Sequence, residues 1–159
     1  MATKDGDIQF KIISSSEFED LFYYVKQGIF KHVDNVFGWN DSFQRKRLLN
    51  DYHPSWFHWV YNDTQRVGLT CFKPYDNAYH VHLLIIFPQY QRLSLGKQVM
   101  TLIHDKALQE QRDQITLSSF RSNTRAIGFY QALGYQIVDD SDDNFMGLAL
   151  YLNNNQIPN

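Results

Sequence analysis

Residues 84–100 read LIIFPQYQRLSLGKQVM. The apolar start of this stretch predicts a strand that breaks at Pro88, and the pattern from Leu95 onward predicts a helix. The first N–H groups of a helix have no partners within the helix and lie at the positive end of its dipole. Because Arg92 and Lys97 lie beside this helix start, the stretch predicts an anion-binding site.

Length and composition limit the class of protein. The chain has 159 residues, of which 43% are hydrophobic, and this suits one domain spanning residues 1–159. Fifteen Lys and Arg against 17 Asp and Glu give a net charge of -2, so a nucleic-acid partner is not expected. No apolar run approaches the roughly 18 residues of a membrane span, and residues 1–10 lack the apolar core of a signal peptide. With a single cysteine, Cys71, these features predict a cytoplasmic protein without a membrane partner.

The residues before the central stretch predict a strand, two helices and three further strands. The first strand is expected over residues 8–13, and the first helix follows Ser16, whose spacing from Glu19 is that of a capping box. Gly28 is expected to weaken or break this helix, and a second helix is expected from about residue 40. The three strands are expected over residues 56–61, 66–73 and 79–87. Their short connections imply antiparallel pairing.

The residues after the central helix predict a strand, a helix and two closing strands. The strand at residues 114–119 follows a helix, so it is expected to run parallel to the strand before that helix, in a right-handed βαβ unit. The next helix is expected to be capped by Ser122 or Asn123 and to end at Gly134. The closing strands are expected over residues 135–138 and 145–152, and a frayed tail over residues 153–159.

Two motifs in the second half of the chain resemble those of a known family. Residues 88–96 resemble the acetyl-CoA loop of the GNAT superfamily of N-acetyltransferases, whose pattern is Gln/Arg-x-x-Gly-x-Gly/Ala. Here the loop reads Gln91-x-x-Ser94-x-Gly96, so a serine stands at the first glycine position. The second motif resembles the family's signature on the helix after the fifth strand, and it reads Asn123-x-x-Ala126-x-x-Phe129-Tyr130-x-x-x-Gly134-Tyr135. One helix and one strand separate the two motifs, as in the family.

The resemblance implies an α/β fold of GNAT type, with a mixed central sheet of about seven strands and helices on both faces. An antiparallel meander would form the N-terminal part of this sheet, and a splayed parallel pair its middle. The resemblance also implies acetyl-CoA as acetyl donor and CoA as product. The pyrophosphate would bind at the loop and helix start, and the pantetheine arm along the strand before the loop. The implied cofactor-binding residues are Leu84, Ile85, Ile86, Gln91, Arg92, Leu93, Ser94, Leu95, Gly96, Lys97, Asn123 and Tyr130.

The same resemblance implies the catalytic residues. Tyr130 matches the tyrosine that donates a proton or hydrogen bond to the departing thiolate. Many members carry a basic glutamate eleven positions before the Gln/Arg of the loop, and His80 stands there in this chain. His82 lies two residues further on and shares one face of the strand. An imidazole is a competent base at neutral pH, so His80 is the expected base, with His82 or a water molecule as alternatives. A zinc site at this pair is not expected, because no third ligand stands at a recognisable spacing.

The expected function is acetyl-CoA-dependent acetylation of a primary amine, either on a small molecule or exposed on a peptide or protein. The amine would attack the thioester directly in a ternary complex, without a covalent acetyl-enzyme. Two alternatives stay open. A non-catalytic acyl-CoA-binding or regulatory GNAT-like module is suggested by Ser94 and by the missing glutamate, and a nucleotide-binding regulator could use the same anion loop. The sequence leaves the acceptor amine open, and a monomer or a homodimer is expected.

Overall fold

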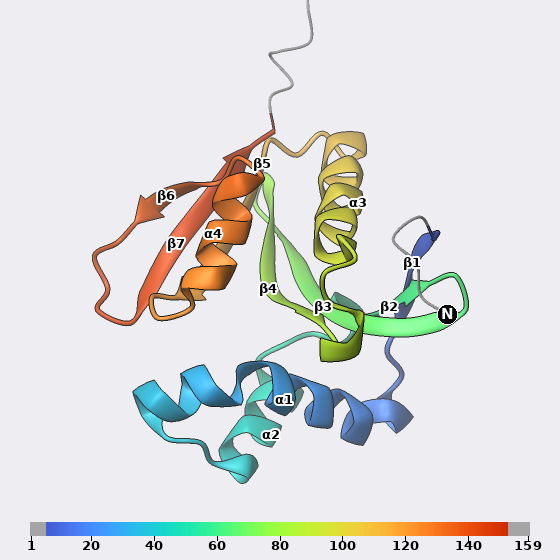
Figure 1. The fold of residues 1–159 in the computed structure, drawn as a ribbon, viewed down its shortest axis with the longest axis vertical. Coiled ribbons are helices and arrows are strands. Elements are labelled where there is room, and N and C mark those ends of the chain that lie inside the picture. The colour runs from blue at the N-terminus through green and yellow to red at the C-terminus, as the bar shows by residue number, and fades with distance from the viewer. Residues whose placement is uncertain (1–5, 153–159) are drawn as a thin grey trace, which may run out of the picture. The chain divides into compact units, whose positions relative to one another are not determined.

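The computed structural model describes residues 6–152, which form seven β-strands and four α-helices (Figure 1). The strands are β1 (Ile8–Ile12), β2 (Phe57–Asn62), β3 (Gln65–Tyr75), β4 (Ala78–Ile86), β5 (Gln114–Phe120), β6 (Gln136–Asp139) and β7 (Phe145–Tyr151). The helices are α1 (Phe18–Phe37), α2 (Asp41–Asn50), α3 (Leu95–Gln109) and α4 (Thr124–Ala132). The expected fraying of residues 153–159 lies outside the described residues.

The strands form one mixed sheet in the order β1-β2-β3-β4-β5-β7-β6. Strands β4 and β5 pair in parallel, whereas the pairs β1–β2, β2–β3, β5–β7 and β6–β7 are antiparallel. The parallel register covers only Ala78 to Val81 of β4 and Gln114 to Leu117 of β5. The predicted α/β fold with a mixed seven-stranded sheet is therefore confirmed.

Contacts between residues divide the chain into two compact units. The first unit contains the chain up to Cys71 and also Leu83–Gly96, and the second contains Phe72–His82 and the chain from Lys97 onward. Strands β3 and β4 and helix α3 each contribute residues to both units. That the chain folds as one domain stays a prediction.

Helix α1 packs on the strands of the first unit through one apolar stripe. The core here is formed by the buried side chains of Leu21, Phe22, Val25, Leu48, Phe57, Trp59, Leu69, Cys71 and Phe87. The predicted break at Gly28 is wrong, because α1 is continuous through this residue. A Cβ at Gly28 would lie 2.7 Å from Ile85 Cδ1, so the glycine allows the helix to approach β4 closely. Figure 1 shows α2 beside α1, and the Lys26–Asp41 and Arg45–Glu19 ion pairs join the two helices.

The cap before α1 lies two residues earlier than predicted. The predicted capping box of Ser16 and Glu19 is wrong, because the box is formed by Ser14 and Glu17 at the 3-10 turn Ser15–Glu17. Both pairs have the same sequence spacing, so local pattern alone does not separate them. The difference is that Glu17 has partners on β2 and β3, far away in the sequence.

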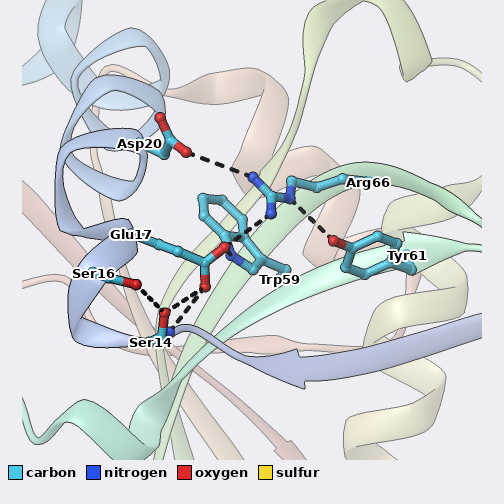
Figure 2. A network of polar contacts seen from close by, with 7 residues as sticks. All are labelled: Ser14, Ser16, Glu17, Asp20, Trp59, Tyr61 and Arg66. Atoms are coloured by element: carbon cyan, nitrogen blue, oxygen red, sulfur yellow. Dashed lines mark hydrogen bonds and ion pairs between the residues drawn. The ribbon is translucent and has the colours of Figure 1, made fainter.

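Glu17 is the centre of a polar network that ties the start of α1 to the β2–β3 hairpin (Figure 2). Trp59 Nε1–H donates to Glu17 Oε2 at 3.1 Å, and Arg66 Nη2 lies 3.0 Å from the same oxygen. The Arg66 guanidinium also lies 4.0 Å from the centre of the Trp59 ring, within cation–π range. The backbone N–H of Ser14, its hydroxyl, Trp59 and Arg66 together hold the pKa of Glu17 below its ordinary value, despite partial burial of the carboxylate.

The second unit is organised by β5, which pairs along its full length with β7. Helix α3 buries an apolar stripe formed by Val99, Met100, Ile103 and Ala107. The Asn123 side chain caps α4 by accepting the N–H of Ala126 at 3.2 Å. Gly134 follows the end of that helix with a φ of 101°, a conformation that favours glycine. Both predicted ends of α4 are confirmed.

Candidate active site

The first feature of the site is a run of half-buried apolar side chains on β4, in the first unit. Leu83, Leu84, Ile85 and Ile86 are four consecutive large apolar residues, and none of them is fully buried. In strand order β4 lies between β3 and β5, where an α/β sheet normally buries such side chains. A Cβ at Gly68 on β3 would collide with the carbonyl oxygen of Ile85, so the glycine permits close approach of the two backbones. The predicted pantetheine-binding strand therefore leaves apolar surface exposed.

The loop after β4 contains two residues in the left-handed backbone region. Arg92 has a φ of 69° and Ser94 a φ of 61°. Such a conformation costs an L-residue roughly 1–2 kcal/mol, and strain of this kind is concentrated at functional sites. Ser94 stands where the loop pattern has glycine, the residue that adopts this conformation without strain. The observed φ therefore gives a physical reason for the glycine in the pattern.

Two of the predicted loop side chains make structural contacts, and two cations beside them are exposed. The Gln91 side chain donates to the carbonyl of Ile86 at 2.9 Å and so ties the loop back to the end of β4. Leu95 begins α3 with its side chain buried, whereas Arg92 and Lys97 are exposed. A helix start beside two exposed cations is suited to an anion.

Tyr130 lies on the buried side of α4, in the second unit, with only 8% of its surface exposed. Its ring lies 5.0 Å from that of Phe129 and 5.3 Å from that of Tyr135, between centroids. The Tyr135 hydroxyl in turn forms a 2.8 Å hydrogen bond with His104 Nε2. Burial raises the pKa of Tyr130 above its ordinary value, so its hydroxyl keeps its proton at neutral pH. It can therefore act as a hydrogen-bond donor.

His80 and His82 lie together on the part of β4 that belongs to the second unit. Their ring centroids are 4.8 Å apart, as expected for side chains on one face of a strand. His80 Nδ1 lies 2.7 Å from Thr116 Oγ1, and the two residues are register partners on β4 and β5. Burial, and to a lesser extent the positive charge of Lys73, lowers the pKa of His80. His80 is therefore neutral at neutral pH, the form that a base requires.

The predicted site residues fall in both units. Leu84, Ile85, Ile86 and the loop from Gln91 to Gly96 belong to the first unit, and Lys97, His80, Asn123 and Tyr130 belong to the second. Their roles toward cofactor and substrate stay predictions. Thr116 was not predicted as a partner of His80, because the contact depends on the register between two strands that are separated by a helix. The Tyr135–His104 contact likewise has no local signal.

Two classes of feature are absent from residues 6–152. Within this described range, no group of three or more His, Cys, Asp and Glu side chains is arranged to hold a metal ion. None of the helices in that range is long and apolar enough to cross a membrane.

Comparisons with known proteins place these features in a family. The sequence model described as the acetyltransferase (GNAT) family matches residues 19–135. No curated protein matches the chain in sequence. Among solved structures, the PaiA N-acetyltransferase from Thermoplasma acidophilum in complex with coenzyme A has a TM-score of 0.71 at 14% identity, covering 91% of this chain and 99% of that one.

Two further solved structures resemble the chain to a similar degree. A GNAT-family acetyltransferase from Staphylococcus aureus Mu50 has a TM-score of 0.71 at 20% identity, with coverage of 92% and 99%. The ribosomal-protein-S18-alanine N-acetyltransferase from Escherichia coli has a TM-score of 0.66 at 14% identity, with coverage of 92% and 94%. At these identities the structures support the fold, and the sequence match over residues 19–135 supports the family. The chain therefore belongs to the acetyltransferase (GNAT) family, whose acetyl donor is acetyl-CoA.

Proposed function

We propose that this protein transfers the acetyl group of acetyl-CoA to a primary amine, either of a small molecule or exposed on a peptide or protein. The observation that carries the proposal is the segment from β4 to α3. It combines a half-buried apolar strand, a loop with two left-handed residues and a helix start beside Arg92 and Lys97. Family membership supports acetyl-CoA as the donor.

The chemistry of this segment fits the parts of acetyl-CoA. The exposed cations and the N–H groups at the α3 start suit a pyrophosphate. The apolar side chains from Leu84 to Ile86 suit the extended arm, whose amides resemble a peptide. In this proposal Gln91, Leu93, Ser94, Leu95 and Gly96 act mainly by shaping the backbone that faces the phosphates. Asn123 contributes through the start of α4, where its side-chain oxygen accepts the N–H of Ala126.

Acetyl-CoA supplies a thioester that an amine can attack. In the proposed direct transfer, a C–N bond forms and the C–S bond breaks, while one proton leaves the amine and one reaches the sulfur. We propose His80 as the group that takes the first proton, because its imidazole is neutral and partly buried. Tyr130 donates toward the sulfur, because burial keeps its hydroxyl protonated.

The function is tested by measuring CoA release from acetyl-CoA with a panel of amines, for the wild type and for Tyr130→Phe. The wild type should release CoA only when an acceptor amine is present. Tyr130→Phe should lower kcat by roughly 100-fold while leaving the affinity for acetyl-CoA nearly unchanged. Tyr151→Phe is a matched control, because Tyr151 is 59% exposed on β7 and lies outside the proposed machinery.

The alternatives give different results in the same assay. A non-catalytic acyl-CoA-binding module would bind acetyl-CoA and turn over none of the amines, and Tyr130→Phe would then change nothing. A nucleotide-binding regulator would show ATP displacing CoA at similar affinity. Either outcome would contradict the proposed acetyl transfer.

A further inference from the structure

His80 has a hydrogen-bond partner that neither the family pattern nor the sequence assigns. Its Nδ1 lies 2.7 Å from the Thr116 hydroxyl, and the two residues face each other across the parallel β4–β5 pair. Both belong to the second unit, so the contact lies within one compact body. Thr116 is half-buried, and its hydroxyl is held on a strand that pairs on its other side with β7. The contact therefore lies on regular backbone rather than on a loop.

The direction of this hydrogen bond decides whether His80 can act as a base. A neutral imidazole carries one hydrogen, and only the other nitrogen has a lone pair that can take a proton. Because Nδ1 is occupied by Thr116, the catalytic lone pair has to be on Nε2. That arrangement requires the hydrogen on Nδ1, donated to the threonine oxygen. If the hydroxyl donated instead, Nε2 would carry the hydrogen and could not take another.

We propose that Thr116 is a positioning residue that holds His80 in the tautomer with its hydrogen on Nδ1, leaving Nε2 to take the proton of the acceptor amine. This inference rests on the role proposed for His80. The Nδ1–H···Oγ1 bond is kept when the imidazole becomes an imidazolium, so the ring need not turn during proton transfer. A base oriented by a third group is a recurring device in enzymes.

A hydroxyl in this position orients the ring without adding charge. The titratable and charged groups that the structure places against His80 are His82 on its own strand and Lys73 on the neighbouring β3. Its hydrogen-bond partner on β5 is the uncharged Thr116. A carboxylate at residue 116 would raise the pKa of His80 and favour the imidazolium, which cannot accept a proton. Threonine therefore combines orientation with a neutral base.

The tautomer can be tested directly, without knowing the acceptor. Long-range ¹H–¹⁵N spectra distinguish protonated from unprotonated ring nitrogens, and His80→Gln assigns the resonances of His80. We expect wild-type His80 to show a protonated Nδ1 and an unprotonated Nε2 at neutral pH. Thr116→Val should shift this population toward Nε2–H, whereas Thr116→Ser should keep it. A wild-type spectrum with the hydrogen on Nε2 would overturn the proposal.

The kinetic consequence is tested on the pH profile of kcat/KM, followed by CoA release. Thr116→Val should lower kcat roughly tenfold, part of the 10²–10⁴-fold that general base catalysis supplies, and leave the KM for acetyl-CoA unchanged. Thr116→Val should also move the acid limb of the kcat/KM profile to lower pH, because the His80 imidazolium loses the hydroxyl oxygen that accepts its Nδ1–H. Thr116→Ser should restore both kcat and the position of this limb. A merely structural role for the hydroxyl would not move that limb. Thr101→Val is the matched control, since the Thr101 hydroxyl bonds the Lys97 carbonyl within α3.

The outcomes separate this inference from the proposed function. If His80→Gln loses activity while Thr116→Val keeps the wild-type rate and pH profile, the positioning role is wrong and acetyl transfer stands. If His80→Gln keeps full activity, His80 is not the base and the inference fails with it. If the wild type acetylates none of the amines, the proposed function fails and takes this role of Thr116 with it.

Discussion

Ser94 is the residue at which this chain departs from the loop pattern of its family. Its φ of 61° shows that the position requires the left-handed conformation, which glycine adopts freely and serine does not. The sequence predicts the loop and the missing glycine, but it does not predict the backbone angle. Arg92, with a φ of 69°, has the same conformation without any glycine in the pattern to signal it.

Ser94→Gly should raise the free energy of unfolding. Removing the left-handed strain gains roughly 1–2 kcal/mol, and the greater freedom of glycine in the unfolded chain costs roughly 0.5–1 kcal/mol. The expected net gain is therefore between zero and about 1.5 kcal/mol, measured by urea denaturation. Ser118→Gly on β5 is the control, since its strand backbone is unstrained, and it should lose about 0.5–1 kcal/mol. Equal losses at both positions would contradict this explanation of the loop.

Single-residue predictions succeeded where the signal is local. The Gly134 terminator and the shared face of His80 and His82 follow from spacing alone, and both are observed. The local pattern predicted Ser122 or Asn123 as the cap of α4, and the structure has Asn123. Thr116 could not be predicted as the partner of His80, because its contact depends on strand register. Register is set by the packing of the whole sheet and not by neighbours in sequence.

At the scale of elements, the start of α1 shows how long-range contacts select between equivalent local patterns. Ser14 with Glu17 and Ser16 with Glu19 both have capping-box spacing. The capping box is formed by the first pair, because Glu17 also accepts a hydrogen bond from Trp59 on β2 and pairs with Arg66 on β3. Helix propensity alone likewise overestimates how much Gly28 weakens α1. A long-range contact explains the presence of this glycine, because it lets the helix approach Ile85 on β4 closely.

Glu17→Gln should therefore weaken the attachment of α1 to the β2–β3 hairpin. The carboxylate accepts bonds from Ser14 and Trp59 and pairs with Arg66, so its loss should cost about 1 kcal/mol at neutral pH. Asp20→Asn is the matched control. The Asp20 side chain is 66% exposed and its oxygen lies 4.0 Å from Arg66, so this change should cost less than about 0.5 kcal/mol. Urea denaturation of both variants measures the difference, and equal losses would contradict the network.

The same network predicts a dependence of stability on pH. The pKa of Glu17 is lower in the folded protein than its ordinary value of 4.5. The stabilisation is therefore complete above that ordinary value and is lost as the pH falls through the lower folded value. In Glu17→Gln this part of the acid dependence should disappear. The test is urea denaturation between pH values of about 3 and 7, and an unchanged acid dependence in the variant would count against the assigned role of Glu17.

At the scale of the whole molecule, the order of strands and helices was predictable because each element has its own periodicity and stop signals. The division into two compact units was not, because its boundaries fall inside β3, β4 and α3, where the sequence pattern is continuous. The acceptor amine was also not predictable. Acceptor recognition depends on side chains gathered by tertiary structure, and the family patterns concern the cofactor.

The positions of the tryptophan residues allow the single-domain prediction to be tested by spectroscopy. Trp39, Trp56 and Trp59 all lie in the first unit, so tryptophan fluorescence reports on that unit alone, while far-UV circular dichroism reports on the whole chain. If the chain folds as one domain, urea unfolding followed by the two signals should give the same midpoint and slope. A second transition seen only by circular dichroism would contradict it.

Acetyl transfer from acetyl-CoA to an amine can be followed directly by mass spectrometry with isotopically labelled acetyl-CoA. The protein is incubated with labelled donor and a panel containing polyamines, amino acids and peptides with free N-termini. At least one amine should acquire the labelled acetyl group in an amount equal to the CoA released, and the protein itself should carry no covalent label. Tight binding of acetyl-CoA without labelling of any amine would contradict acetyl transfer by this protein.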